Sequence, residues 1–223
     1  MNEMLGKRAV SDHQKTVRRQ TVLSAARELF VEAGFFDVSM SMIAKRASVA
    51  KGTVYLYYKT KEELFLELSR LDLEDWFDDL MGKLRSLPEN PESSEFVSVI
   101  CSTLEGRQTA IRLLSLLHLV LEKNVSHEEV LKFKLDLMER SQIAGAEIER
   151  LLTFLKLGQG SEFLGAIHCQ IIGWGQMSDI SPVVNEVLED ERVAPLRIDF
   201  QTSLQTSLLC MVEGMKKLSL HDK

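Results

Sequence analysis

The sequence predicts an all-α protein, and three features of the chain indicate it. Almost every segment after Thr16 carries apolar residues at three- and four-residue spacing, which is the period of an amphipathic helix. Capping boxes mark helix starts at Thr60 with Glu63 and at Ser126 with Glu129. The chain has no useful run of alternating apolar and polar residues and no Asn-Gly hairpin turn, so strands are not expected.

The first sixty residues predict three helices. The first begins at about Thr16 and stops at Gly34. A short second helix, MSMIAKRA, follows Ser39 as its N-cap, and a third, KGTVYLYY, follows the turn Ser48-Val49-Ala50. We expect residues 1–15 to form a flexible arm in front of these helices.

The remaining chain predicts a series of longer helices. A fourth helix opens at the Thr60 capping box and continues to about Leu84, which is long enough to join two domains. Two prolines between Ser86 and Pro91 mark a loop, and a short helix is expected between Pro182 and Pro195. The other helices are expected at about 93–105, 107–123, 127–155, 161–177 and 199–217.

This pattern divides the chain into a three-helix N-terminal domain (16–60), a connecting helix (61–84) and a C-terminal helical bundle (85–223). Their charges differ. Residues 1–60 hold ten Lys and Arg against five Asp and Glu, whereas residues 61–223 hold seventeen against twenty-eight. A basic N-terminal domain followed by an acidic remainder is typical of a protein in which one small domain binds phosphates. A chance asymmetry is the alternative.

The cysteines and the hydropathy pattern indicate the compartment. Cys101, Cys169 and Cys210 are odd in number, far apart and outside any CxxC pair, so neither a disulfide framework nor structural zinc is expected. Each has apolar neighbours and no nearby cation to stabilise a thiolate, which predicts small buried hydrophobic residues. A run of ~18 apolar residues and a signal peptide are both absent from the sequence, so we expect a cytoplasmic protein without a membrane partner.

Residues 39–63 contain the pattern most informative about function. Ile43, Ala44, Ala47 and Val54 fit two short helices that cross at a three-residue turn. A helix-turn-helix of this kind places its second helix in the major groove of DNA, with its N-terminal residues on base edges and phosphates. An ordinary corner of a helical bundle would have the same spacing.

Cations at helix starts favour the nucleic-acid interpretation. Arg18 and Arg19 fall in the predicted first turn of the first helix, and Lys51 and Lys61 open the third and fourth. Each opposes the helix dipole at a cost of about 0.3 to 1 kcal/mol. Because helix N-termini with added cations bind phosphate, we expect a polyanion to be the missing partner.

From Val22 to Leu68 the chain resembles the TetR family of transcriptional regulators. The segments ARELFVEAGF, IAKRASVAKGTVYLYY and KTKEELF follow that family's order and spacing. The resemblance implies a homodimeric repressor that leaves a pseudo-palindromic operator when its C-terminal ligand-binding and dimerisation domain takes up a small effector. Ser48 replaces a common Gly and should adopt a positive φ, and Ala50 replaces a common Ser or Thr cap, each at about 1 kcal/mol.

Matching positions in this family imply six DNA contacts. Thr53 and Tyr55 are placed for base edges, and Lys51 for either a base or a phosphate. The phosphate contacts are expected from Ser39, Tyr57 and Lys61. Packing beneath the first helix is the alternative for Tyr57 and the favoured interpretation for Tyr58.

Two further surfaces are expected in the C-terminal domain. Aromatic, Met and His residues among aliphatic ones suggest a pocket for an unknown, largely apolar effector. The expected lining is His118, Phe133, Met138, His168, Trp174 and Met177.

The apolar faces of the last two helices exceed what one core readily uses, which suggests a dimer interface. Its expected residues are Phe163, Ile167, Ile171, Leu204, Leu208 and Met211. Close-packed core is the alternative for both sets.

An enzyme and an interaction module without DNA binding are the competing function classes. The sequence has no GxSxG, P-loop, HExxH or strand-following GxGxxG motif. His118 with Glu122, and His168 with Cys169, are conceivable metal ligands. His168 and Cys169 are adjacent, so on a helix their side chains point about 100° apart and cannot share one ion, and a solvated Glu122 is the alternative for the other pair. An interaction module would explain the bundle and not the cations at helix starts. We therefore expect no catalysis, no cofactor and no metal.

Overall fold

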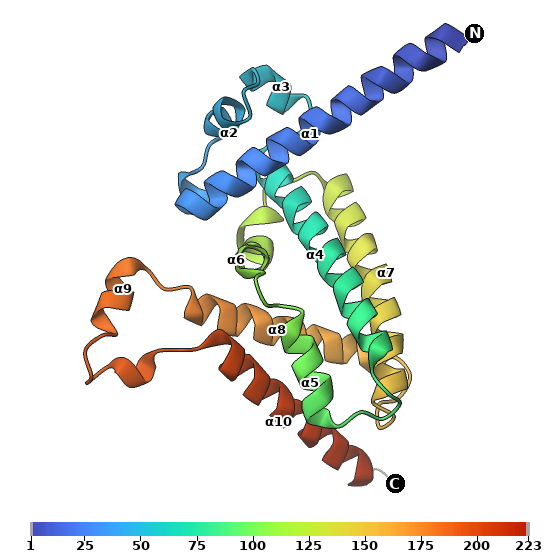
Figure 1. Ribbon diagram of the computed structural model, residues 1–223, viewed down its shortest axis with the longest axis vertical. Helices are drawn as coiled ribbons and strands as arrows, with labels where there is room; N and C mark the ends of the chain where they lie inside the picture. The colour runs from blue at the N-terminus through green and yellow to red at the C-terminus, as the bar shows by residue number, and fades with distance from the viewer. Residues whose placement is uncertain (1, 222–223) are drawn as a thin grey trace. The chain divides into compact units, whose positions relative to one another are not determined.

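Every secondary-structure element is helical throughout the described residues. The computed structural model describes the backbone of residues 2–221 and the side chains of residues 14–220. The helices are α1 (Asn2–Asp37), α2 (Met40–Arg46), α3 (Lys51–Tyr55), α4 (Lys61–Ser86), α5 (Ser93–Ser102), α6 (Gln108–Leu116), α7 (His127–Leu151), α8 (Gln159–Ser178), α9 (Pro182–Val187) and α10 (Phe200–His221) (Figure 1). A π-helical turn, η1 (Leu117–Leu121), and a 3-10 turn, η2 (Ala194–Leu196), complete them. The predicted all-α fold class is confirmed.

Most predicted helices lie within a few residues of their expected positions, and the differences have local causes. The helix expected at 107–123 is divided, because α6 ends at Leu116 and continues as the π-helical turn η1. The helix expected to reach 155 ends at Leu151. Gly158, expected as part of its stop signal, has φ 89° and instead precedes α8 as its N-cap residue. A left-handed backbone of this kind is accessible to glycine at little cost.

α1 differs most from its predicted extent. Its helical backbone begins at Asn2, so Arg18 and Arg19 lie in the middle of the helix and not in its first turn. Two of the cations that were expected to oppose a helix dipole therefore do not. Near its other end the chain breaks at Gly34 (φ 75°, ψ 173°), the predicted stop. The arm predicted for residues 1–15 coincides with this helical backbone, and its side chains before Gln14 lie outside the described residues, so the arm stays a prediction.

The described chain forms two compact units, and their boundary falls inside α4. The first unit contains Met1–Leu68 together with His118–Ser126, and the second contains Ser69–Leu117 together with His127–Lys223. The predicted boundaries at 60 and 84 differ from this division. The segment of η1 and the following loop belongs to the first unit although its neighbours in the chain belong to the second.

Three phenylalanines form the centre of the first unit. Phe65 of α4 packs against Phe30 and Phe35 of α1, with ring centroids 5.6 Å and 5.2 Å apart. All three are almost fully buried, as are Ile43 of α2 and Val54 of α3. The start of α4 is therefore the base on which α1, α2 and α3 pack.

In the second unit α8 packs against α6, α7 and α10, and α10 also packs against α5. Figure 1 shows α8 and α10 side by side. The crossing of α7 and α8 is close because both helices have a glycine there. A Cβ atom added to Gly160 would overlap the carbonyl oxygen of Gly145 and would lie 2.7 Å from its carbonyl carbon. Phe96 of α5 packs against Phe163 of α8, with ring centroids 6.1 Å apart, and both side chains are buried in this core.

The residues predicted for a dimer interface lie in the core of the single chain. Phe163, Ile167, Ile171, Leu204 and Leu208 are each at most 2% exposed. The sixth residue, Met211, is partly buried and accepts a hydrogen bond from Gln170 Nε2 at 3.3 Å. The apolar faces of α8 and α10 are thus used by α5, α6 and α7. Any surface on these helices for a second chain must consist of other residues.

The cysteines and the chain between α8 and α10 also depart from expectation. Cys101 is buried, and burial raises the pKa of its thiol to about 11, but Cys169 and Cys210 are exposed. The prediction of three buried cysteines is therefore wrong for two.

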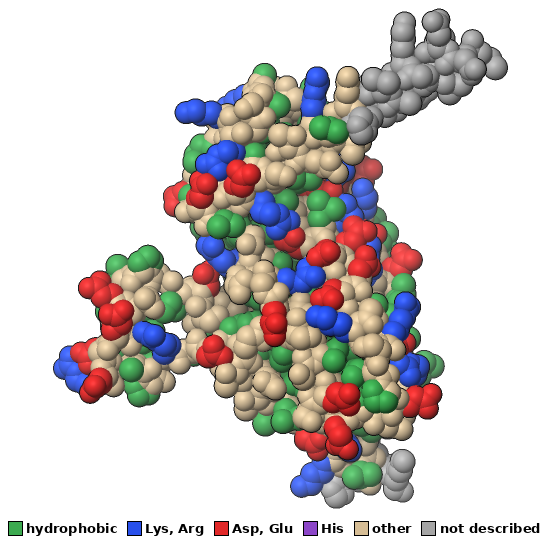
Figure 2. Space-filling model, in the orientation of Figure 1, with side chains coloured by type: hydrophobic (Ala, Val, Ile, Leu, Met, Phe, Trp, Pro, Cys, Tyr) green, Lys and Arg blue, Asp and Glu red, His purple; other side chains and the backbone are tan. Residues whose placement is uncertain are grey.

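Between α8 and α10, α9 and its flanking turns stand out as a lobe with exposed apolar side chains, including Val183 and Leu196 (Figure 2).

None of the helices in the described part of the chain has the length and apolar character needed to cross a membrane.

Candidate functional site

The helix-turn-helix is built as the sequence predicts. Ser39 caps α2 by accepting a hydrogen bond from the Met42 amide at 3.3 Å. Ser48 in the turn adopts φ 54°, the positive value expected for a position that glycine commonly fills. The next amide, that of Val49, donates to the carbonyl of Ala44 at 3.0 Å and closes the turn.

α3 is short and is anchored by one side chain. Ala50 precedes it without a side-chain cap, as predicted, and the helix spans five residues. Val54 is fully buried against the first unit, which turns the rest of the helix outward. Lys51 and Tyr55 are exposed, and the ammonium of Lys51 lies 5.8 Å from the centre of the Tyr55 ring. A cation and an aromatic phenol that share one face of a short helix can reach both phosphates and base edges.

The six predicted DNA-contact residues fall into three groups. Ser39, Lys51 and Tyr55 are exposed, and Thr53 and Tyr57 are partly exposed. Lys61 is turned inward, where its ammonium donates to backbone carbonyls of the first unit. On the visible face of this unit, Figure 2 shows lysine and arginine side chains with acidic and apolar side chains among them.

Tyr58 is a core residue, which was the favoured interpretation. Its side chain is 5% exposed, and its hydroxyl accepts a hydrogen bond from Arg19 Nε at 3.1 Å. Arg19 also forms an ion pair with Glu67 of α4. Arg46 of α2 is held in a similar way by Glu28 and Glu32 of α1, at 3.2 Å and 2.7 Å. These arginines connect helices of the unit to one another.

Sequence reasoning missed two features of this surface. Leu56 directly follows α3 and is 82% exposed, so it can contact a thymine methyl group. No local sequence signal marks the end of α3 at Tyr55, so the exposure of Leu56 could not be predicted. A Cβ atom added to Gly52 would meet no heavy atom within 4 Å, so packing within the chain does not require glycine there. The open space allows another backbone to approach closely.

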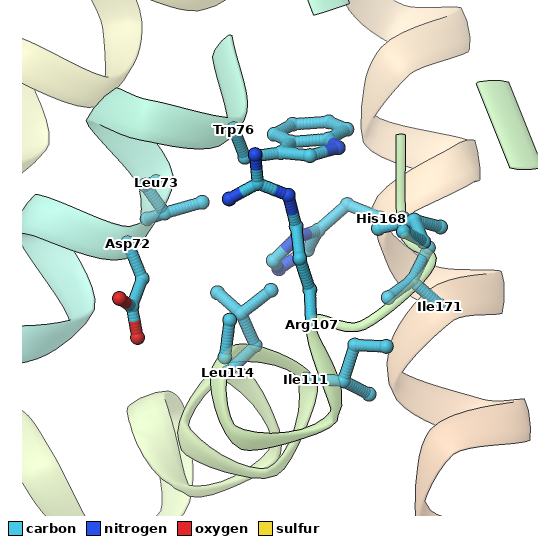
Figure 3. A pocket seen from close by; sticks show the side chains of 10 residues that line it. Asp72, Leu73, Trp76, Arg107, Ile111, Leu114, His168 and Ile171 are labelled. Atoms are coloured by element: carbon cyan, nitrogen blue, oxygen red, sulfur yellow. The ribbon is translucent and has the colours of Figure 1, made fainter. Parts of the chain in front are cut away.

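The second unit contains a largely apolar cavity between α4, α6 and α8. Its volume is about 20 Å³, and Leu73, Trp76, Ile111, Leu114 and Ile171 line it with mostly aliphatic and aromatic surface. Figure 3 shows these side chains around His168, whose ring points into the space. Three convergent helices with an apolar lining and few polar groups are typical of a small-molecule site.

Arg107, a charged residue of the lining, already has hydrogen-bond and ion-pair partners within the chain. Its Nε atom donates to the carbonyl of Thr103 at 2.9 Å, and its guanidinium forms ion pairs with Asp75 and with Asp79, the latter at 3.7 Å. Figure 3 shows the guanidinium directed toward the Trp76 indole. The indole nitrogen donates to Thr103 Oγ1 at 2.9 Å, so this wall of the cavity is fixed by hydrogen bonds.

The structure brings one of the six predicted pocket residues to this cavity, namely His168. Phe133 is buried at a separate, smaller hollow beside Arg70 and Arg140. Met138 and Met177 are more than half exposed. His118 lies in η1 of the first unit and Trp174 donates to Ser207 Oγ at 2.9 Å, away from the cavity lining. Residues of α4 and α6, which the sequence did not single out, form most of the lining.

The conceivable metal ligands are not assembled into a metal site. Across the described residues, no three His, Cys, Asp or Glu side chains lie together in an arrangement that could hold an ion. His118 Nδ1 instead lies 3.3 Å from Glu122 Oε2, one helical turn away.

Comparison with known proteins decides the family. Residues 22–68 match the bacterial regulatory proteins of the tetR family, and residues 71–218 match the tetracyclin repressor-like C-terminal domain. The chain belongs to the TetR family. The resemblance predicted from Val22 to Leu68 is confirmed, and it extends through the second unit.

Relatives of this TetR-family protein include regulators of several kinds. The fatty acid metabolism regulator protein of Bacillus subtilis is 26% identical over 183 residues, which is 79% of this chain and 94% of the relative. QacR of Staphylococcus aureus is 34% identical over 58 residues, but these are 26% of this chain and 31% of QacR. The second similarity therefore covers only about a quarter of this chain.

Solved structures share the fold of this TetR-family chain. FadR, a fatty acid degradation regulator from Bacillus halodurans, matches with a TM-score of 0.52 at 16% identity, over 85% of this chain and 97% of FadR. A tetR-family protein from Rhodococcus RHA1 matches with a TM-score of 0.59 at 16% identity, over 87% and 96% of the two chains. The protein is a DNA-binding transcriptional regulator, and release from DNA by a small effector is typical of its family.

Proposed function

We propose that this protein is a dimeric repressor whose α3 binds its operator and whose cavity takes up an acyl-chain effector. The observation that supports operator binding most directly is the exposure of Lys51 and Tyr55 on a helix anchored by buried Val54. Exposed Ser39 lies at the start of α2, where a phosphate can be bound. The proposal is tested by selecting genomic DNA fragments that bind the protein and measuring the retardation of these fragments in a gel-shift assay.

Substitutions in α3 should separate phosphate contact from base contact. Lys51→Ala is expected to weaken binding to operator and unrelated DNA about equally and to lower the salt slope by about one, because one released counterion is lost. Tyr55→Ala is expected to cost about tenfold at the operator and to relax sequence preference. Fluorescence anisotropy over a range of salt concentrations measures both. Unchanged affinity in both variants, with native circular dichroism, would remove α3 from the interface.

The dimer is proposed to form on an exposed stripe of small residues along α8 and α10. Its members are spaced four residues apart on each helix, and they are Gly165, Cys169 and Gly173 on α8 with Thr206, Cys210 and Gly214 on α10. Around each of the three glycines a Cβ atom would meet no heavy atom within 4 Å, so the packing of one chain does not explain them. Rows of residues spaced by four are the ridges through which helices pack, and small side chains let a second copy come close.

The effector is proposed to carry an acyl chain. The cavity lining is apolar apart from His168, Asp72 and Arg107, which suits a hydrocarbon chain with one polar end. The cavity is small, so the surrounding helices must move apart to admit such a chain. The fatty acid regulators of Bacillus subtilis and Bacillus halodurans, which cover most of this chain, support the same chemistry. QacR, by contrast, matches only 26% of this chain and gives little support for a shared ligand.

Filling the cavity should abolish the effector response and preserve operator binding. Ala110 lies on the cavity side of α6, and Ala110→Phe is expected to occupy the space and to reduce effector affinity at least tenfold. Titration of protein–operator complexes with fatty acids and acyl thioesters of increasing length measures the release. Gly82→Ala, outside the cavity lining and outside the proposed dimer interface, is the control. Release by quaternary ammonium compounds and not by acyl compounds would contradict the proposed ligand class.

A further inference from the structure

The first turn of α4 closes the corner between α1 and α2. Lys61 Nζ donates hydrogen bonds to the backbone carbonyls of Phe35 at 2.7 Å and Val38 at 2.8 Å. Carbonyls at the end of a helix lack donors from their own helix and favour a nearby cation. α1 has no basic residue in its last turn, so Lys61 supplies this cation from another helix.

The Phe35 ring extends this contact. The ammonium of Lys61 lies 4.1 Å above the centre of the ring, and Phe65 packs against the same ring edge-on at 72°. Lys61 and Phe65 are four residues apart and share one face of α4. One face of α4 therefore holds both the side chain and the carbonyl of Phe35.

The backbone that Lys61 holds leads directly into the DNA-binding helices. Val38 is 2% exposed and precedes Ser39, the N-cap of α2. α2 in turn packs against α3. A shift at the Val38 carbonyl would therefore move the start of α2 and, through the turn at Ser48, the exposed face of α3.

The environment of Lys61 differs from that of an exposed phosphate contact. Burial lowers its pKa, while the nearby carboxylates of Glu62 and Asp37 act in the opposite direction. An ammonium group has three protons to donate, and two are directed at carbonyls. Only the third proton of the Lys61 ammonium is left to donate to a DNA phosphate.

We infer that Lys61 is a positioning residue for operator binding, which sets the start of α2 and thereby the orientation of α3. The contact also explains why a lysine opens α4 against the helix dipole, because the carbonyls at the end of α1 offset that cost. Its loss should reduce discrimination between operator and unrelated DNA. A phosphate contact would instead strengthen binding to both kinds of DNA.

The test compares three variants of the full-length protein by anisotropy on operator and on unrelated duplex. Lys61→Met keeps the apolar stem and removes the donors, and it is expected to lose about tenfold or more of operator affinity. Its affinity for unrelated DNA and its salt slope should match those of the native protein. Lys61→Arg keeps a cationic donor and should recover most of the operator affinity. Lys59→Met removes an exposed charge of the same segment and measures the effect of charge alone.

Two results would overturn the inference. Equal losses on both kinds of DNA with a salt slope lower by about one would identify a phosphate contact. Unchanged affinity for both kinds of DNA would identify a lysine without influence on binding. Circular dichroism and thermal unfolding establish that each variant is folded, and Lys61→Gln, which retains an amide donor, replaces Lys61→Met if the latter is not.

Discussion

Leu208→Glu is expected to unfold the second unit. Leu208 is 1% exposed in the middle of α10, where it packs in the core shared with α5 and α8. A carboxylate at this position would lose its hydration without gaining a partner, and the apolar contacts of leucine would also be lost. We expect a loss of about 4 to 5 kcal/mol in the free energy of unfolding, measured by urea denaturation.

Cys210→Glu, two residues further along, provides the matched comparison. Cys210 is exposed and belongs to the stripe proposed as the dimer interface. The same carboxylate here should leave the chain folded and produce a monomer, which light scattering and circular dichroism can establish together. In the proposed dimer, Cys169 and Cys210 should resist alkylation until dilution separates the chains. A dimer that persists in Cys210→Glu would place the interface elsewhere.

Gly160→Ala should also be strongly destabilising, although it adds a single methyl group. That methyl group would overlap the carbonyl of Gly145, and backbone atoms cannot rotate away as a side chain can. α7 and α8 would have to separate, which we expect to cost about 3 kcal/mol. For a chain of this size such a loss lowers Tm by about 10 °C, which differential scanning calorimetry can detect.

Gly82→Ala is the control for this substitution. Gly82 lies inside α4, and a Cβ atom there would meet nothing within 4 Å. Alanine should therefore stabilise the helix, by about 1 kcal/mol. Equal stability of Gly160→Ala and the native protein would show that α7 and α8 are less closely packed than the structure has them.

Local signals predicted the cap and the turn of the helix-turn-helix, but not the end of α3 at Tyr55. The cap at Ser39 and the positive φ of Ser48 depend on a few adjacent residues, so the sequence contains what determines them. The start of α1 was not predicted, because polar residues can continue a helix without showing an apolar face. The end of α6 was missed for a related reason, since a π-helical turn keeps the helical pattern of apolar residues.

Tertiary partners account for the other differences. The apolar faces of α8 and α10 were expected to meet a second chain, but periodicity shows only that a face is buried and not what buries it. Phe163 packs on Phe96 of the same chain. The inward orientation of Lys61 likewise depends on carbonyls more than twenty residues earlier. Contacts between distant segments of this kind leave no mark in a local pattern.

The placement of His118–Ser126 in the first unit affects how that unit can form during synthesis. The hydroxyl of Thr60 donates to the Asn124 carbonyl at 2.9 Å, and the Asn124 amide donates to Glu62 at 3.2 Å. The start of α4 therefore receives its last partners from a segment made some sixty residues later. A nascent chain that has emerged only as far as α4 lacks these bonds, so the start of α4 gains its last hydrogen bonds only after η1 has left the ribosome.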